Sequence, residues 1–348
     1  MNELMLLCQK MREGYTPRIQ DPTKPVRYWS EKDVFNGEVV DAYVLILRTR
    51  GCAWALHSGC TMCGYGNDSL WKPASEKDLL HQVDTALKQY AGEPVVKIFT
   101  SGSFFDTGEI PVNVRNHLFE ALSEKTKKIS VESRPEYVTK DNLVSMKKVF
   151  SSQVCEIGVG LETASDIVRD YAVNKGFTFK QYVKAVEIMK KNRCDLKTYV
   201  LVKPPFLTEN EALKDTLSTI KAIQDLTTTV SLNPTNVQRN TLVEYLWRRK
   251  QFRPAWLWSI VEILRKGKEL FGEKRLQCDV VGGGSRQGAH NCGSCDHKVL
   301  EAITSFSLHQ DTRVFDGLDC ACKEQWRDQL EVEPLSFGSI VDFSEKRR

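Results

Sequence analysis

The chain has 348 residues, of which 41% are hydrophobic and 27% charged, as in a globular protein with one large domain and room for an appendage. Its formal charge of +4 allows a polyanionic partner without requiring one. No apolar run reaches the roughly 18 residues of a membrane span, and the first residues lack the long apolar segment of a signal peptide. We therefore expect a cytoplasmic protein without a membrane association.

The predicted elements begin after a polar N-terminal extension, residues 1–41, whose role the sequence does not reveal. Short runs rich in β-branched residues then predict six strands, at 42–48, 94–99, 128–132, 155–161, 196–202 and 229–233. Helical patterns lie between them and begin at N-capping side chains, Ser75, Thr139, Thr178 and Thr208.

This alternation of strand and helix predicts an α/β fold with a parallel sheet. Right-handed crossovers would shape residues 42–240 into a partial (β/α)6 TIM-type barrel, with its active site at the C-terminal ends of the strands. An open doubly wound sheet is the alternative. Residues 241–348 differ in composition from the preceding part: they are first basic and Trp-rich and then rich in Gly, Cys and His. We expect them to form a small C-terminal metal-binding module.

Three cysteines, Cys52, Cys60 and Cys63, follow the first predicted strand in the sequence RTRGCAWALHSGCTMCGYG. Three thiolates can hold three irons of a [4Fe-4S] cluster and leave the fourth iron open, whereas a structural site normally has four protein ligands. Met62 can shield such a cluster from solvent. A structural zinc site with His57 as the fourth ligand is the alternative.

This motif resembles the signature of the radical S-adenosylmethionine (SAM) superfamily, and its seven-residue first gap is similar to that of the elongator-like subgroup. The resemblance covers roughly residues 42–240. It implies a barrel of the radical SAM type, SAM as a cofactor and an external electron donor. In that chemistry the reduced cluster cleaves SAM, and the resulting 5′-deoxyadenosyl radical abstracts hydrogen from the substrate.

The resemblance also implies SAM contacts at the strand ends. The segment TSGSFF matches by position the glycine-containing motif for the SAM amino group, and Glu132 and Arg134 of VESRPEYV suit the ribose hydroxyls and the SAM carboxylate. A turn and a surface ion pair are the alternatives. The full set of expected cofactor-binding residues is Tyr65, Ser101, Gly102, Ser103, Glu132, Arg134, Glu162, Lys203 and Asn233, with Gln238 as a further residue of the barrel mouth.

A second cysteine group lies near the C-terminus, in GAHNCGSCDH and LDCACKEQW. Four thiolates favour a closed structural zinc site, and an auxiliary iron–sulfur cluster or four free core cysteines are the alternatives. The predicted ligands are Cys292, Cys295, Cys320 and Cys322. Because a C-x-C pair can be too strained to bind one metal, Cys278, His290 or His297 could replace Cys322.

The segment 244–276 combines nine Lys or Arg residues with four Glu residues and six interleaved aromatic residues. This mixture suits phosphate contacts and base stacking, which predicts nucleic-acid binding. The alternative is that the aromatic side chains anchor helices to the core while the charged side chains are solvated.

The whole chain resembles one family, the radical SAM subunit of archaeal archaeosine synthase, in RTRGCAW, GCTMCGYG, FTSGSFFD, VESRPEYV, GVGLETA and the tail HNCGSCD with LDCACKEQW. That resemblance implies a lyase-type C–N cleavage of a lysine-modified 7-deazaguanine in the tRNA D-loop, which gives archaeosine. It also implies a partner subunit that installs the lysine, and a homodimer is a further expectation. Another radical SAM tRNA modifier, elongator-like or methylthio-transferring, and a non-catalytic RNA-binding metalloprotein are the competing hypotheses.

Overall fold

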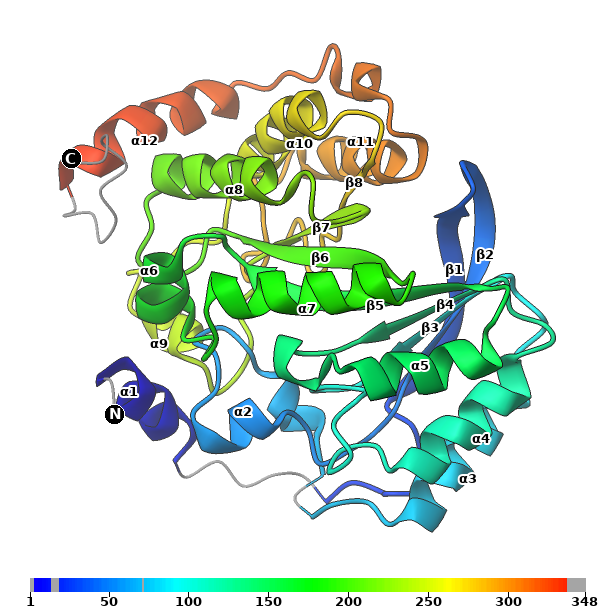
Figure 1. The fold of residues 1–348 in the computed structure, drawn as a ribbon. Coiled ribbons are helices and arrows are strands. Elements are labelled where there is room, and N and C mark those ends of the chain that lie inside the picture. Colours follow the sequence, from blue (N-terminus) through cyan, green and yellow to red (C-terminus); the bar gives the residue numbers. More distant parts are fainter. Residues whose placement is uncertain (1–2, 14–18, 71, 337–348) are drawn as a thin grey trace.

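One sheet of eight strands organises the molecule. The structure, a computed structural model, describes residues 3–13, 19–70 and 72–336. The strands follow one another in chain order, and neighbours are parallel except for the antiparallel first pair (Figure 1). They are β1 (Arg27–Phe35), β2 (Glu38–Ile46), β3 (Val95–Phe99), β4 (Lys128–Glu132), β5 (Val154–Glu162), β6 (Asp195–Val202), β7 (Thr229–Pro234) and β8 (Arg275–Cys278).

The six predicted strands are confirmed as β2 to β7, and two further strands extend the sheet at its edges. Strand β1 lies in the predicted N-terminal extension and joins β2 through Asn36 and Gly37, both with positive φ, as a two-residue type I′ hairpin turn requires. Strand β8 lies in the predicted C-terminal module and pairs with β7. Strand pairing therefore continues across residues 41 and 240, and the domain boundaries placed there stay predictions.

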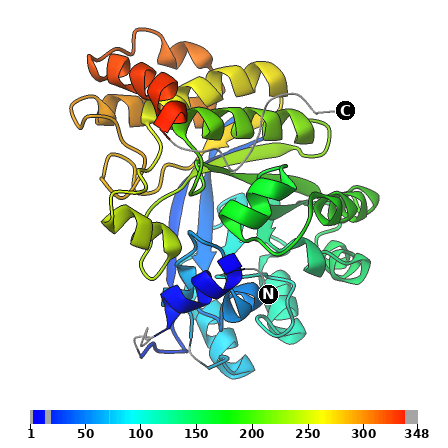
Figure 2. The same cartoon turned by 90° about the vertical axis from the view of Figure 1, so that its left-hand side faces the viewer.

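Helices cover the outer face of the curled sheet, which forms a half-barrel (Figures 1 and 2). The four predicted N-caps are confirmed, with reciprocal capping boxes at Ser75, Thr178 and Thr208. The helices are α1 (Glu3–Arg12), α2 (Ala53–His57), α3 (Glu76–Leu87), α4 (Val112–Leu122), α5 (Lys140–Val149), α6 (Asp166–Val168), α7 (Phe179–Lys191), α8 (Glu209–Ile223), α9 (Leu242–Arg248), α10 (Leu257–Phe271), α11 (Asp296–His309) and α12 (Cys322–Ser336), with shorter turns η1 (Tyr65–Asp68), η2 (Pro135–Tyr137), η3 (Arg169–Val173) and η4 (Thr312–Phe315).

The two faces of the sheet differ because side chains alternate along each strand. Apolar residues such as Ile98 and Val131 pack against the helices in the main core. The concave face instead carries buried ion pairs in the amino-terminal half of the parallel strands: Asp33 with Lys97 and Arg275, and Glu156 with Lys128 and Lys197, at 2.6 to 3.1 Å. These pairs fill the base of the half-barrel and leave its carboxyl-terminal end to the candidate site.

The same apolar core continues into the C-terminal region, where α10 packs on α8. Phe252, Trp256, Trp258 and Phe271 are all buried, which excludes base stacking on these four aromatic residues. The core-anchor interpretation therefore holds for them. Among the described residues, no helix is long and apolar enough to cross a membrane.

Candidate functional site

The first cysteine group occupies the loop between β2 and α3, directly after the carboxyl end of β2. Cys52 precedes α2, and the backbone of Gly102 lies directly against it: a Cβ atom on Gly102 would come within 2.6 Å of the Cys52 Cα atom. Any side chain at position 102 would therefore displace the cysteine. The structure thus brings the predicted Ser101–Ser103 segment and the cysteine loop together.

The middle of this loop is held by the segment that follows β5. Thr61 donates from its backbone N–H to the carbonyl of Val173 at 3.0 Å, and Asn174 donates from Nδ2 to the carbonyl of Gly59 at 2.7 Å. Cys60 packs among Val173, Leu201 and Met62, so that burial raises the pKa of its thiol to about 12. A thiolate at Cys60 therefore requires a strongly positive partner, such as cluster iron.

Helix α1 closes the loop from the other side and lies beside α2 and α9 (Figures 1 and 2). The Arg12 guanidinium donates to the carbonyls of Ala55 and Ser58 at 2.8 Å and of Cys63 at 3.2 Å. It passes so near Gly59 that a side chain there would overlap it. No sequence pattern in the N-terminal extension indicated this contact of Arg12 with the cysteine loop.

The predicted Glu132 and Arg134 are bonded to the Ser101–Ser103 segment. The backbone N–H of Arg134 donates to Ser103 Oγ at 3.0 Å, and that of Phe104 donates to the Glu132 carbonyl at 2.8 Å. Burial raises the pKa of the Glu132 carboxyl, and a hydrogen bond from Tyr199 opposes this rise. Burial opposes the charge of Arg134, but the Glu136 carboxylate raises its pKa, and Cys52 and Cys60 add to that effect.

Glu162 pairs with Lys175, a residue that the sequence analysis missed. The Lys175 Nζ to Glu162 Oε1 distance is 2.5 Å, and the Lys175 carbonyl accepts a hydrogen bond from Arg134 at 3.0 Å. Gly160 leaves room for the pair, because a Cβ there would lie 2.8 Å from both charged groups. Burial opposes the charge of Lys175, but Glu162 and then Cys60 raise its pKa, which places the ammonium in the electrostatic field of the cysteines.

The remaining predicted residues lie at different places. Lys203 forms a buried ion pair with Glu209 at 2.6 Å, and its role in SAM binding stays a prediction. Asn233 lies on β7, half-buried, beside Ser231. Gln238 accepts a hydrogen bond from the Gly64 backbone N–H at 2.5 Å and bonds to Tyr65, which fastens the β7–α9 loop to the end of the cysteine loop.

The four C-terminal cysteines converge at the starts of α11 and α12. Their Sγ atoms all lie within 4.8 Å of one another, with 4.0 Å between Cys292 and Cys295 and 3.7 Å from Cys292 to Cys320 and from Cys295 to Cys322. A tetrahedral ion with bonds of about 2.3 Å to sulfur needs sulfurs about 3.8 Å apart. The site is thus complete with Cys322.

The three alternative ligands have other partners or positions. His290 Nδ1 bonds to the Gly288 carbonyl, His297 pairs with Glu301, and Cys278 is buried on β8. Nitrogen donors instead surround the cysteine sulfurs: Trp258 Nε1 donates to Cys322 and Asn291 Nδ2 to Cys295, both at 3.3 Å. Such donors stabilise metal-bound thiolates.

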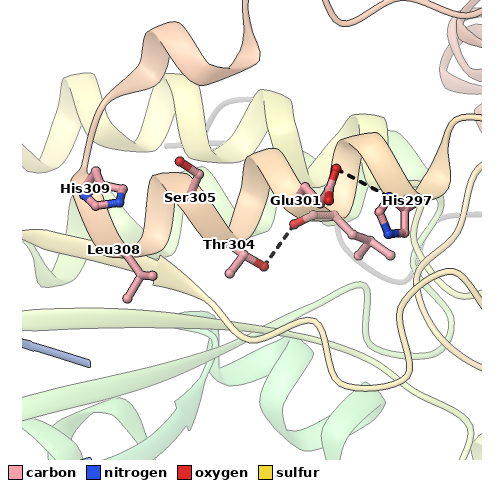
Figure 3. A pocket seen from close by; sticks show the side chains of 7 residues that line it. His297, Glu301, Thr304, Ser305, Leu308 and His309 are labelled. Atoms are coloured by element: carbon pink, nitrogen blue, oxygen red, sulfur yellow. Dashed lines mark hydrogen bonds and ion pairs between the residues drawn. The ribbon is translucent and has the colours of Figure 1, made fainter. Parts of the chain in front are cut away.

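A surface hollow on α11 is lined by His297, Leu300, Glu301, Thr304, Ser305, Leu308 and His309 (Figure 3). All of these residues belong to one helix, and none of the seven cysteines of the two groups is among them. We therefore place the candidate site at the cysteine loop.

The basic segment separates into a buried and an exposed part. Arg248, Arg249 and Lys250 at the end of α9 are exposed, and the Arg249 guanidinium lies 3.6 Å from the ring centre of Tyr245. Trp247 donates from Nε1 to the carbonyl of Arg286, another exposed residue, at 3.2 Å. The exposed cations thus gather around α9, beside the cysteine loop.

Comparisons with known proteins identify the family of the chain. The Radical SAM superfamily matches residues 46–220. The archaeosine synthase subunit beta of Methanosarcina acetivorans is 40% identical over 95% of this chain and 97% of its own length, and that of Thermococcus kodakarensis is 37% identical over 90% and 99%. The solved structure of methylornithine synthase covers 79% of this chain and 69% of its own, with 14% identity and a TM-score of 0.48. The chain belongs to the radical SAM superfamily, in the family of the archaeosine synthase beta subunits.

Proposed function

We propose that this protein is a cytoplasmic radical SAM enzyme that completes archaeosine in tRNA. Its substrate is a lysine-modified 7-deazaguanine in the D-loop, and its reaction is a lyase-type cleavage of the C–N bond between the lysine nitrogen and its side-chain carbon. The nitrogen stays on the base as the formamidine. The contact of the Cys52 loop with Gly102, in a chain similar over its full length to archaeosine synthase beta subunits, carries this proposal.

The residues at the loop fit the two groups that this chemistry needs. Cys52, Cys60 and Cys63 would hold a [4Fe-4S] cluster with one open iron. When bound, the cluster and SAM supply the radical that removes hydrogen from the substrate. Ser101, Gly102 and Ser103 offer a close backbone approach to the SAM amino group, while Glu132 and Arg134 suit its ribose and carboxylate.

The ion pair between Lys175 and Glu162 would place two fixed charges in the part of the mouth where SAM is proposed to bind. Lys175 lies within the field of Cys60, and its ammonium offsets the negative charge of thiolates bound to iron. Arg12 secures the loop that covers the opposite side. These contacts would hold the loop in place beside the site in which a reactive radical forms.

The second cysteine group supports a structural zinc ion, because the sulfur separations suit one tetrahedral ion and all four positions are filled by protein. An auxiliary cluster is the alternative, and metal analysis distinguishes the two. The zinc would fix the starts of α11 and α12 against Trp258 of α10.

Exposed cations around α9 support tRNA binding beside the mouth. We call Arg239, Arg248, Arg249, Lys250 and Arg286 the α9 surface; all five are exposed. Two hydrogen bonds tie this surface to the cysteine loop: Asn67 Nδ2 donates to the Arg239 carbonyl at 2.9 Å, and the Val243 backbone N–H donates to the Thr61 carbonyl at 3.1 Å. A polyanion held there would present a nucleotide to the barrel. A lysine-transferring partner subunit, an electron donor and a homodimer complete the proposed assembly.

The decisive experiment uses anaerobically reconstituted protein with SAM, dithionite and tRNA carrying the lysine-modified base. We expect iron and sulfide in cluster proportion, one zinc per chain, and formation of both 5′-deoxyadenosine and archaeosine. SAM cleavage without any change of this base would favour another radical SAM tRNA modifier. Absence of both iron absorption and SAM cleavage would favour a non-catalytic RNA-binding protein.

The α9 surface gives a separate prediction. Reversing two of its charges with Arg249→Glu and Arg286→Glu should weaken tRNA binding about tenfold or more and make the salt dependence of binding shallower, because fewer phosphates are neutralised. Filter binding over a range of salt concentrations measures both effects. Arg327→Glu, on an exposed site of α12, is the matched control and should change binding little. If the Arg327→Glu control lost as much tRNA affinity as the charge-reversal variant, binding would not be confined to the α9 surface.

A further inference from the structure

Asp279, the residue directly after β8, adds a further carboxylate to the mouth of the half-barrel. It is not among the site residues that the sequence predicted. Cys278 of β8 is opposite Leu232 of β7, and both side chains belong to the apolar core on the helix side of the sheet. Asp279 follows Cys278 and Asn233 follows Leu232. Because side chains alternate along a strand, both therefore face the concave side of the sheet. The Asp279 backbone N–H donates to the Leu232 carbonyl at 2.9 Å, which fixes this register at the carboxyl end of the sheet.

The Asp279 side chain is exposed, and its carboxylate accepts a hydrogen bond from the Val281 backbone. Within the described part of the chain it forms no ion pair. The two nearby lysines are engaged elsewhere: Lys97 lies 2.6 Å from Asp33, and Lys197 lies 3.1 Å from Glu156. The carboxylate therefore keeps free acceptor sites for a ligand.

The strand order places Asp279 in the same mouth as the SAM residues, on the far side of Tyr199. Tyr199, on β6, lies beside Glu132, on β4: a Cβ atom on Gly158 between them would come within 2.8 Å of the Tyr199 ring and 3.3 Å of the Glu132 side chain. Asp279, after β8, lies two strands beyond Tyr199 along the sheet.

The loop that follows Asp279 is hydrogen-bonded to the β7–α9 loop, which in turn is hydrogen-bonded to the cysteine loop. Gly288 approaches the Gly282 carbonyl so closely that a side chain there would overlap it, which makes the glycine-rich loop 280–288 compact. Val237 donates to the Gln287 carbonyl at 2.7 Å, and the adjacent Gln238 bonds to Gly64. Asp279 is therefore held at a defined position relative to the cysteine loop.

We propose that Asp279 binds an aliphatic ammonium of the substrate, with Asn233 beside it as a second hydrogen-bonding group. This inference rests on the proposed function, in which the base carries a lysine with a free amino group. Five strand spacings of about 4.8 Å separate β3, which Gly102 follows, from β8 along the sheet, so a ligand group at Asp279 is distinct from one at Gly102. A carboxylate on this side selects for the cationic end of the lysine.

The test compares tRNA bearing the lysine-modified base with the same tRNA after acetylation of the lysine amine, which removes the charge. With wild-type holoenzyme, acetylation should lower kcat/KM about tenfold to a hundredfold. Asp279→Asn should lose a similar factor on the unacetylated tRNA and discriminate little between the two substrates. Asn233→Ala should reduce the discrimination partially, and Asp328→Asn, at an exposed site of α12, should retain it.

Cluster content, circular dichroism and substrate-independent SAM cleavage should stay at wild-type values in Asp279→Asn and Asp328→Asn, which separates a binding effect from a folding effect. Equal activity of the wild-type enzyme on both substrates would overturn the proposal without any variant. A raised KM for SAM in Asp279→Asn would also overturn it, by assigning the residue to the cofactor. If wild-type enzyme cleaves SAM but leaves lysine-bearing tRNA unchanged, the proposed function itself fails.

Discussion

The two cysteine groups use the same ligand atom in opposite settings. The C-terminal four lie at the starts of two helices, with neighbouring sulfurs 3.7 to 4.0 Å apart, and their surroundings are local. The first three lie on one long loop whose shape depends on α1, on the segment after η3 and on the β7–α9 loop. A compact four-sulfur site suits one structural ion, whereas a three-sulfur loop supported by the whole fold suits a reactive cluster.

The thiols differ electrostatically within the second group as well as between the two groups. Burial raises the pKa of Cys60 and of Cys295 to about 12. Burial also opposes ionisation of Cys292, but hydrogen bonds from the backbone N–H groups of Cys295 and Ser294 and from neighbouring thiols lower its pKa to about 6. Cys292 thus favours a thiolate before a metal arrives, whereas Cys60 and Cys295 depend on the charge of the metal itself.

The largest expected effect comes from Cys60→Ala. Loss of one of three ligands should abolish cluster-dependent SAM cleavage, while the fold is retained because Cys60 lies outside the main core, in a small separate cluster with Val173 and Leu201. Release of 5′-deoxyadenosine measures the first effect and circular dichroism the second. Cys194→Ala, at a buried cysteine outside both groups, should keep the cluster. Global unfolding of Cys60→Ala would instead show that the first group is structural.

Cys292→Ser should disrupt the second cysteine site and leave the cluster at the first site intact. We expect loss of the zinc ion, a melting temperature lower by roughly 5 to 10 °C because α11 and α12 lose their common anchor, and weaker tRNA binding, with the cluster still present. Zinc and iron analysis together with a thermal melt provides the measurement. Ser294→Ala, an exposed neighbour in the same loop, is the control. One zinc per chain remaining in the Cys292 variant would refute the assignment of this ligand.

Arg12→Met should have a smaller effect that is confined to the first site. Removing the three hydrogen bonds to the carbonyls of the cysteine loop should loosen the loop, so that a chelator bleaches the cluster several-fold faster. Visible absorption follows the bleaching. Zinc content should not change, and Lys10→Met, at an exposed position of the same helix, should behave as wild type. Unchanged bleaching would show that α1 does not support the loop.

Local sequence patterns were sufficient for much of the fold. Six strands followed from β-branched runs, and the helix starts at Ser75 and Thr208 followed from capping side chains, because both depend on neighbouring residues alone. The Asn36-Gly37 pair is also a local hairpin signal and could have revealed β1. Strand β8 has only 4 residues, which are too few for a recognisable strand pattern in the sequence.

The sequence by itself grouped Cys52, Cys60 and Cys63 and paired Cys292 with Cys295 and Cys320 with Cys322, because these spacings are short and thiols are chemically distinctive, and the structure joins the last two pairs. Only the tertiary structure decided what surrounds them. Arg12 and Lys175 reach the cysteine loop from distant segments, Lys203 turns to Glu209, and Trp258 is buried although its segment is basic. Packing decides these positions, because burial and charge pairing depend on which segments meet and not on which residues are adjacent in the chain.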